Sequence, residues 1–340
     1  MRGWASAVGF GALLLVGSGL ATPARAACRM VKIGELPVQV DGPHLTVEAQ
    51  INGRPVRLIV DTGSFATLLF RGSIQQLGLT TKPLDSVRFY GVGGDAGAQM
   101  THVNAFTLSN LVIQNLNLLV AGRSKLGGAQ GILGAGFLLQ ADVEFDLPEG
   151  RLRLFKPEGC TGDQVVYWGK AYSATPMIGD NTQQIDVTVL LNGAPLRAEM
   201  DTGSDLSVVT TAAAAKAGLT PTSPGVKTAE QAHGLGAQSV QNYVGVFPTF
   251  TFGDETIKNA RLRVADLFHA DTDVRAGSRI KGQAFEEPQM LLGADFFRSH
   301  RVYVSRGQKK VYVSYMGGPV FQARRPPPAV PVTQPPPAGK

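Results

Sequence analysis

Asp61-Thr62-Gly63-Ser64 and Asp201-Thr202-Gly203-Ser204 are two copies of one tetrapeptide within a chain of 340 residues. Each copy lies in a longer matching frame. An Asn-Gly pair precedes each aspartate by nine residues, and a Gly-Leu pair follows it by seventeen. Because the two frames align without a gap, the chain is predicted to contain two related halves. The flanking pairs are Asn52-Gly53 and Gly78-Leu79 in the first half, and Asn192-Gly193 and Gly218-Leu219 in the second.

Each aspartate is predicted to end a buried β-strand. Apolar residues alternate with others on both sides of the Asn-Gly pair, which is the pattern of a β-hairpin. After each motif the sequence predicts a short apolar strand and then a helix of about two turns that ends at Gly78 or Gly218. The predicted strands cover 45–51, 56–61 and 67–70 in the first half, and 185–191, 196–201 and 206–209 in the second.

Three further features recur in the same order in both halves. They are a glycine-rich hairpin tip, an apolar pair followed by glycine, and a terminal pair of strands. Many short strands with little helix predict an all-β architecture. The features are Tyr90-Gly91-Val92-Gly93-Gly94, Ile132-Leu133-Gly134 and strands 143–145 with 151–155, then His233-Gly234-Leu235-Gly236, Leu291-Leu292-Gly293 and strands 302–304 with 310–315.

The N-terminal 26 residues have the order of a secretory signal peptide. Arg2 precedes an apolar run from Val8 to Leu20, and Ala24-Arg25-Ala26 provides small residues for cleavage. A permanent membrane anchor is disfavoured because the run is short and interrupted by glycine. Lipidation of Cys28 is disfavoured because Arg25 stands where such a signal needs an aliphatic residue. We therefore expect a secreted protein, in the periplasm, with no stable membrane insertion after cleavage.

The two cysteines bracket the first half of the chain. Since an exported protein meets an oxidising compartment, Cys28 and Cys160 are predicted to form a disulfide; the alternative is a pair of free buried thiols.

After the signal peptide (1–26), the boundaries predicted are 27–165 for lobe 1 and 166–320 for lobe 2. Residues 321–340 are rich in proline and poor in large apolar residues, and they predict a disordered tail that acts as a spacer or, less favoured, as a docking segment.

The charge of the chain excludes some classes of partner. Loss of Arg2 and Arg25 would leave 30 basic and 26 acidic residues, and no basic stripe with interleaved aromatic residues is present. We therefore expect no nucleic acid partner.

The five histidines show no metal-ligand spacing, so no metal and no other cofactor is expected. A charged stretch around 266–287 makes the second half longer and is predicted to be a surface loop.

The order of strand, Asp-Thr-Gly-Ser, glycine-rich hairpin and Leu-Leu-Gly resembles the aspartic proteases, most closely their retropepsin-like branch. The resemblance covers about residues 45–315. It implies a two-lobed, retropepsin-like β-barrel fold with internal pseudo-two-fold symmetry, here in one secreted chain that we expect to be a monomer. The implied activity is that of an aspartic endopeptidase, a hydrolase of peptide bonds in extended protein or peptide substrates.

Two strand-end loops related by a pseudo-two-fold axis would bring Asp61 and Asp201 together as a catalytic dyad. Such a pair should share one proton, so that one carboxylate activates a water while the other polarises the scissile carbonyl. The resemblance also implies supporting roles for the rest of each motif. Gly63 and Gly203 would allow close backbone approach, Thr62 and Thr202 would brace the opposite lobe, and Ser64 and Ser204 would hydrogen-bond the carboxylates.

The glycine-rich tips would be flaps that close over a substrate bound as an added β-strand. The flap residues implied are Tyr90, Gly91, Gly93, Gly94, His233, Gly234 and Gly236, although Tyr90 and His233 could equally be hairpin residues with no direct role. One position departs from lobe symmetry. Asp295 follows Gly293-Ala294, whereas Gly136 stands at the matching place in lobe 1.

Two other classes of function compete with the endopeptidase. A non-catalytic peptide-binding protein with a protease fold is the main alternative, but it has no need for two carboxylates held together. A glycoside hydrolase could also use two carboxylates. The chain has only two tryptophans, one of them in the signal peptide, and carbohydrate clefts commonly use exposed aromatic residues.

Overall fold

The structure is a computed structural model. It describes residues 27–91, 94–122, 126, 128–169, 171–179, 183–233, 239–266 and 287–321, with backbone only at 85–96 and 230–241. The predicted signal peptide, most of the predicted surface loop around 266–287, and the tail after residue 321 lie outside the described residues. Within the described part of the chain, no helix has both the length and the apolar character needed to cross a membrane.

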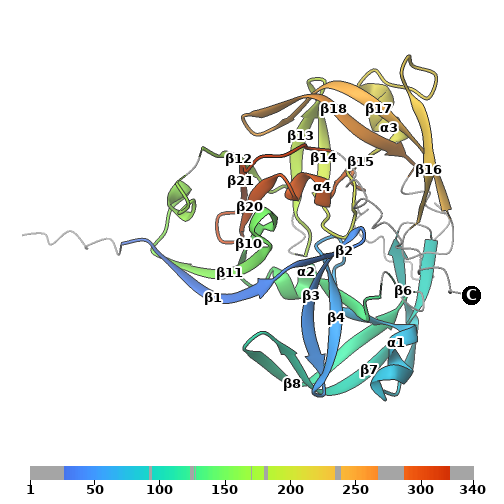
Figure 1. Ribbon diagram of the computed structural model, residues 1–340, viewed down its shortest axis with the longest axis vertical. Helices are drawn as coiled ribbons and strands as arrows, with labels where there is room; N and C mark the ends of the chain where they lie inside the picture. Colours follow the sequence, from blue (N-terminus) through green and yellow to red (C-terminus); the bar gives the residue numbers. More distant parts are fainter. Residues whose placement is uncertain are drawn as a thin grey trace, which may run out of the picture.

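Lobe 1 is built on an eight-stranded sheet in the order β2-β3-β4-β9-β5-β8-β7-β6. Pairing of β3 with β7 closes six of these strands into a barrel, the lower one in Figure 1. The strands are β2 (Gln39–Asp41), β3 (His44–Ile51), β4 (Arg54–Asp61), β5 (Leu68–Phe70), β6 (Lys82–Gly91), β7 (Gly94–Leu108), β8 (Leu111–Ala121) and β9 (Gly131–Gly134).

Lobe 2 repeats this topology in a seven-stranded sheet, β13-β14-β19-β15-β18-β17-β16, which a β13–β17 pairing closes. The repeat confirms the two-lobed all-β fold predicted from the duplicated motif. The strands are β13 (Asp186–Leu191), β14 (Ala194–Met200), β15 (Val208–Thr210), β16 (Lys227–His233), β17 (Ser239–Phe252), β18 (Glu255–Ala265) and β19 (Met290–Leu292).

Short helices follow the strands at the same places in both lobes. Helices α1 (Arg71–Leu77) and α3 (Thr211–Lys216) are the predicted two-turn helices. The backbone turns left-handed at Gly78 and Gly218, where φ is +66° and +87°, as expected for glycines that end helices. The remaining helical turns are α2 (Ala135–Leu138), η1 (Leu147–Glu149), η2 (Gly162–Val165) and α4 (Ala294–Phe297), and the predicted lobe boundary lies at the end of η2.

A six-stranded sheet joins the two lobes on the left of Figure 1. Its order is β1-β11-β10-β20-β21-β12, so three strands come from each half of the chain. The predicted strand pairs are present as β10–β11 and β20–β21, and β10 pairs with β20 across the lobes. The strands are β1 (Arg29–Pro37), β10 (Asp142–Asp146), β11 (Arg151–Glu158), β12 (Ser173–Pro176), β20 (His300–Ser305) and β21 (Lys310–Tyr315).

The core runs through both lobes and the sheet between them. Phe145 of lobe 1 packs edge-on against Phe297 of lobe 2, with ring centroids 5.2 Å apart. The predicted disulfide between Cys28 and Cys160 is present and ties the start of β1 to the segment after β11. Phe321, assigned from sequence to the tail, is instead buried and packs on Phe250 with ring centroids 4.9 Å apart.

Candidate active site

Asp61 and Asp201 lie next to each other where the two lobes meet. Asp61 is the last residue of β4, and Asp201 follows the last residue of β14. Each carboxyl faces the glycine of the other motif. A Cβ on Gly63 would lie 2.6 Å from Cγ of Asp201, and Gly203 is held equally close to the Asp61 carboxyl. Glycine is therefore required at both positions for the two carboxyls to approach, and both aspartates remain partly exposed.

Backbone amides hold both carboxylates in place. Gly63 and Ser64 donate their N–H groups to Oδ1 of Asp61, at 3.0 and 2.9 Å. The second motif repeats this arrangement, at 2.9 and 3.3 Å from Oδ1 of Asp201. The two serines thus contact the carboxylates through their backbone N–H groups. Their hydroxyls donate instead to the carbonyls of Ala66 and Leu206, at 3.0 and 2.8 Å, and so stabilise the loops.

The two threonines link the lobes through a reciprocal set of hydrogen bonds. Thr62 donates its hydroxyl to the Met200 carbonyl at 2.6 Å and accepts the Thr202 N–H at 3.0 Å. Thr202 donates its hydroxyl to the Val60 carbonyl at 2.8 Å and accepts the Thr62 N–H at 3.1 Å. Both side chains are fully buried. This network fixes the two aspartates relative to each other.

Burial raises the pKa of the Asp61 carboxyl well above its usual value, and the nearby charge of Asp201 raises it further. Burial also raises the pKa of Asp201, against hydrogen bonds from Gly203 and from Asp61 that favour its charged form. Because the two carboxyls interact this closely, they titrate as one pair. One proton shared between them satisfies both side chains, and the pair then carries a single negative charge.

The segments Ile132-Leu133-Gly134 and Leu291-Leu292-Gly293 pack against the aspartate loops. Gly134 pairs with Asp61 in the parallel β4–β9 ladder, and a Cβ at Gly134 would lie 2.7 Å from the Ser64 carbonyl. In lobe 2, Asp295 accepts hydrogen bonds from the N–H and the hydroxyl of Ser207, at 2.9 and 2.6 Å. At the matching place in lobe 1, a Cβ on Gly136 would lie 2.6 Å from the Phe65 carbonyl. The asymmetry therefore has a steric reason.

The two predicted flaps are present as hairpins. Strands β6 and β7 pair as far as Gly91 and Gly94, and β16 pairs with β17 as far as His233 and Ser239. Both hairpins reach the right-hand side of Figure 1, away from the sheet that joins the lobes. The side chains of Tyr90 and His233, and all of Gly93, Gly234 and Gly236, lie outside what the structure describes.

Glu199 is a third carboxyl at this site that the sequence analysis did not select. It lies on β14 two residues before Asp201 and is 5 % exposed. Burial raises the pKa of the Glu199 carboxyl, and the charges of Asp201, Asp186 and, more weakly, Asp61 raise it further, which shows that Glu199 lies near the pair. The sequence does distinguish Glu199, because alignment of the two motifs places this acidic residue opposite the apolar Ile59 of lobe 1.

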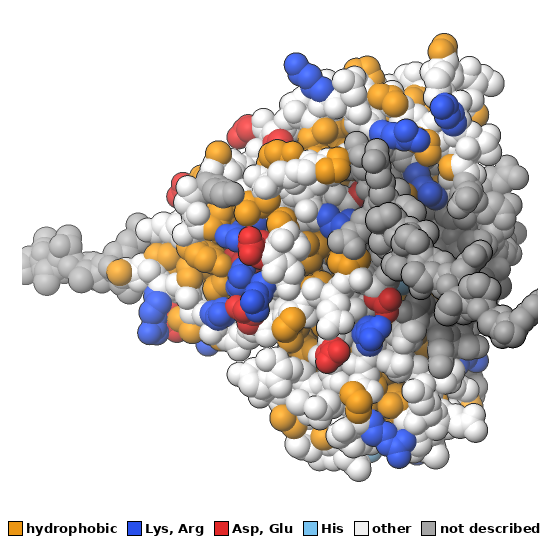
Figure 2. Space-filling view, in the orientation of Figure 1, with side chains coloured by type: hydrophobic (Ala, Val, Ile, Leu, Met, Phe, Trp, Pro, Cys, Tyr) orange, Lys and Arg blue, Asp and Glu red, His pale blue; other side chains and the backbone are white. Residues whose placement is uncertain are grey.

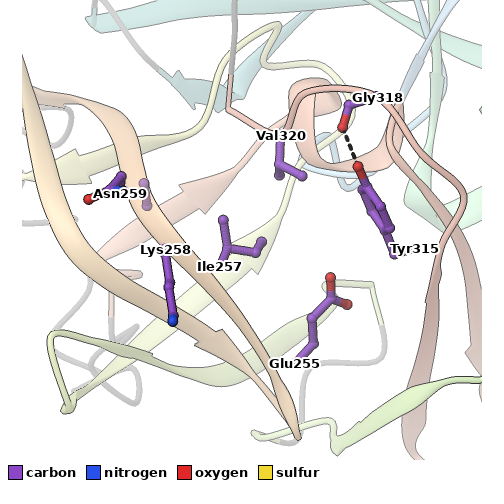
Figure 3. A pocket seen from close by; sticks show the side chains of 8 residues that line it. Glu255, Ile257, Lys258, Asn259, Tyr315, Gly318 and Val320 are labelled. Carbon is purple, nitrogen blue, oxygen red and sulfur yellow. Dashed lines mark hydrogen bonds between the residues drawn. The ribbon is translucent and has the colours of Figure 1, made fainter.

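Two pockets in the described part of the chain are lined by residues other than the predicted site residues. A pocket of about 340 Å³ lies between β18 and the segment after β21, and Figure 3 shows its lining side chains with the 2.6 Å hydrogen bond from Tyr315 to the Gly318 carbonyl. Across the described residues, no cluster of histidine, cysteine and acidic side chains could hold a metal ion.

Comparison with known proteins agrees with this geometry. A family model described as aspartyl protease matches residues 47–137 and 186–296, which together make up more than half of the chain. Among solved structures, the aspartic proteinase from Irpex lacteus is similar with a TM-score of 0.50 and 14% sequence identity, over 83% of this chain and 97% of that one. At this identity the likeness shows the fold alone. No curated protein matches the chain in sequence.

Proposed function

Because the chain belongs to the aspartyl protease family, we propose that it is an endopeptidase in which Asp61 and Asp201 together activate a water molecule. The observation that carries this proposal is the close approach of the two carboxyls, each packed against the glycine of the opposite motif. Holding two carboxyls together in a poorly solvated place is unfavourable unless they share a proton, and such pairs are typical of catalytic sites.

The reaction follows from the protonation of the pair. With one shared proton, the ionised carboxylate accepts a proton from the water as the water attacks the peptide carbonyl carbon. The protonated carboxyl donates its hydrogen bond to the carbonyl oxygen, on which negative charge develops. Collapse of the tetrahedral intermediate breaks the C–N bond, and the leaving amine takes a proton from the pair. The backbone N–H groups at Gly63, Ser64, Gly203 and Ser204 keep the carboxylates oriented throughout.

The substrate of this activity would be an extended peptide. The β6–β7 and β16–β17 hairpins end in glycine-rich tips, whose backbone could pair with a substrate strand and close over it. We further propose that the mature enzyme is exported to the periplasm and acts as a monomer. The signal-like N-terminus, the Cys28–Cys160 disulfide and the presence of both aspartates in one chain support this.

A cleavage assay tests the function directly. The mature chain would be incubated with a broad peptide library from pH 3 to pH 8, with Asp61→Asn and Asp201→Asn variants as controls of nearly identical size. The proposal predicts cleavage by the wild type, mostly at acidic to neutral pH, and none above background by either variant. A folded wild type that cleaves no peptide would favour the non-catalytic peptide-binding alternative. Cleavage by a variant would show that the activity does not use the pair.

A further inference from the structure

Glu199 lies on the same side of its strand as the catalytic aspartate of lobe 2. Side chains alternate along a β-strand, so Glu199 and Asp201 point to one face of β14, and Ala198 and Met200 to the other. Ala198 and Met200 are fully buried in the core of lobe 2. Glu199 is therefore directed away from that core, to the side of the strand on which Asp201 lies.

The two lobes differ in chemistry on this face. Ile59 holds the matching place in lobe 1 and belongs to a small apolar cluster with Leu68, Phe70 and Ile132. In lobe 2 the residues at these places are Glu199, Val208, Thr210 and Leu291. The residues that pair with Ile59 and Glu199 on the neighbouring strands also differ. Thr46 of β3 pairs with Ile59, whereas Asp186 of β13 pairs with Glu199. On this face, one lobe thus has buried apolar side chains and the other has two buried carboxyls.

Glu199 has no cationic partner among the described residues. One oxygen accepts a hydrogen bond from the Gln184 amide at 3.2 Å. Arg197, two residues before Glu199 on β14, is paired with Oδ2 of Asp186 at 2.6 Å, and Oδ1 of Asp186 is buried without a hydrogen-bond partner. Burial raises the pKa of Glu199 to about 9, and the charges of Asp201 and Asp186 act in the same direction. The carboxyl therefore keeps its proton at neutral pH unless a cation approaches.

We propose that Glu199 makes the lobe 2 side of the site selective for a substrate residue with a cationic side chain, lysine or arginine, next to the scissile bond. This inference rests on the proposed endopeptidase function. A lysine or arginine has an apolar stem, which suits the apolar Val208 and Leu291 beside Glu199, and a charge at its end. On binding, the Glu199 proton leaves to solvent, and the carboxylate forms a charge-assisted hydrogen bond with the cation. Ile59 gives the lobe 1 side a preference for apolar residues.

Binding of non-cleavable peptides tests this independently of turnover. Peptides would carry a hydroxyethylene group in place of the scissile amide, with either lysine or norleucine on one side of it and then on the other. Norleucine has the same carbon stem as lysine without the charge. Calorimetry with the mature wild type should show about tenfold tighter binding of lysine than of norleucine at one of the two positions.

Three variants make the result specific to Glu199. Glu199→Gln removes the charge with little change in size and should abolish the preference for lysine. Glu199→Ile introduces the residue found in lobe 1 and should reverse the preference. Glu48→Gln, the same change at an exposed residue of β3, is the matched control and should keep it. A thermal melt of each variant checks that it is folded, and the Gln variant keeps the test valid if the Ile variant is not.

The outcomes separate this inference from the endopeptidase function. The inference would be overturned if the wild type bound the lysine and norleucine peptides equally, or if the preference for lysine survived Glu199→Gln. Cleavage of the matching amide peptides would then still support the endopeptidase function. Lysine binding that depends on Glu199 without any cleavage would support the inference and count against the peptidase. Failure to bind any of the peptides would overturn both.

Discussion

Thr62 and Thr202 are buried side chains that act on the site by holding the two aspartate loops together. Each hydroxyl donates to a carbonyl of the opposite lobe and accepts an N–H from it, so four polar groups that are buried between the lobes are satisfied by two side chains. A buried polar group left without a partner costs about 1–3 kcal/mol. The two threonines are thus a link between the stability of the lobe contact and the position of the aspartates.

Thr62→Val should destabilise the protein by about 2–4 kcal/mol, because it leaves the Met200 carbonyl and the Thr202 N–H without their partner. Urea denaturation would measure the loss. Thr46→Val is the matched control, since Thr46 is also buried but makes one long hydrogen bond, of 3.4 Å, to Gln39. It should cost about 1 kcal/mol or less. Equal losses for the two variants would contradict the account.

The pKa of Glu199 predicts how stability depends on pH. Its folded pKa of about 9 lies above the ordinary glutamate pKa of 4.5, so the folded state holds the proton more tightly than the unfolded state. The stabilisation is fully present below about pH 4.5 and is lost as pH rises toward 9, with a slope of up to about 1.4 kcal/mol per pH unit. Glu199→Gln should flatten the stability curve in this window.

Denaturation at several pH values would measure this effect. Glu48→Gln is a suitable control because Glu48 is exposed on β3, and it should leave the shape of the curve unchanged. A pH dependence that is the same in the wild type and in Glu199→Gln would show that Glu199 ionises in the folded protein as it does in the unfolded chain.

At the scale of elements, the six-stranded sheet between the lobes contains a buried ionic network. Arg153 of β11 donates to Glu144 and Asp146 of β10, at 2.5 and 2.9 Å, and both carboxylates are fully buried. Arg301 of β20 also bonds Asp146, so the network crosses from one lobe to the other. Figure 2 shows charged side chains gathered on this left-hand part of the surface. The network connects strands whose pairing joins the lobes.

Arg153→Met should destabilise the protein by about 3–5 kcal/mol, because it leaves the buried Glu144 without a cation and Asp146 with Arg301 alone, while it keeps an apolar stem. Arg151→Met on the same strand is the control. Among the described residues Arg151 pairs only with Glu35, and its side chain is 45% exposed, so its loss should cost about 1 kcal/mol or less. Denaturant titrations of the two variants would give the comparison, and a small effect at Arg153 would show that the network contributes little.

Some of the strand pairings could be predicted from the sequence, and others could not. The hairpins before Asp61 and Asp201 could be predicted because the alternation and the Asn-Gly turns are local signals. The β10–β20 pairing could not, since apolar strands such as 143–145 and 302–304 give no register to a distant partner. Phe321 was assigned to the tail because prolines follow it. Left-handed backbone at Gly317 and Gly318, with φ of +114° and +86°, precedes its packing on the core.

At the scale of the whole molecule, the duplication predicted the pseudo-symmetry and the meeting of the two aspartates. It could not predict where the lobes differ. Glu199 occupies a strand position that is apolar in lobe 1, and its environment depends on Asp186 and Gln184, which the sequence does not place beside it. Symmetry therefore accounts for the shared geometry of the aspartate pair, and the departures from symmetry account for the proposed selectivity.

The central claim is that one aspartate from each lobe forms a single catalytic unit. A double-mutant cycle measures this most directly, with kcat/KM determined for the wild type, Asp61→Asn, Asp201→Asn and the double variant on the best peptide from the library. Residues that act as a unit are strongly non-additive. We predict that each single variant loses at least about 10³-fold and that the double variant is no worse than either. Losses that multiply in the double variant, or a single variant that keeps wild-type activity, would contradict the account.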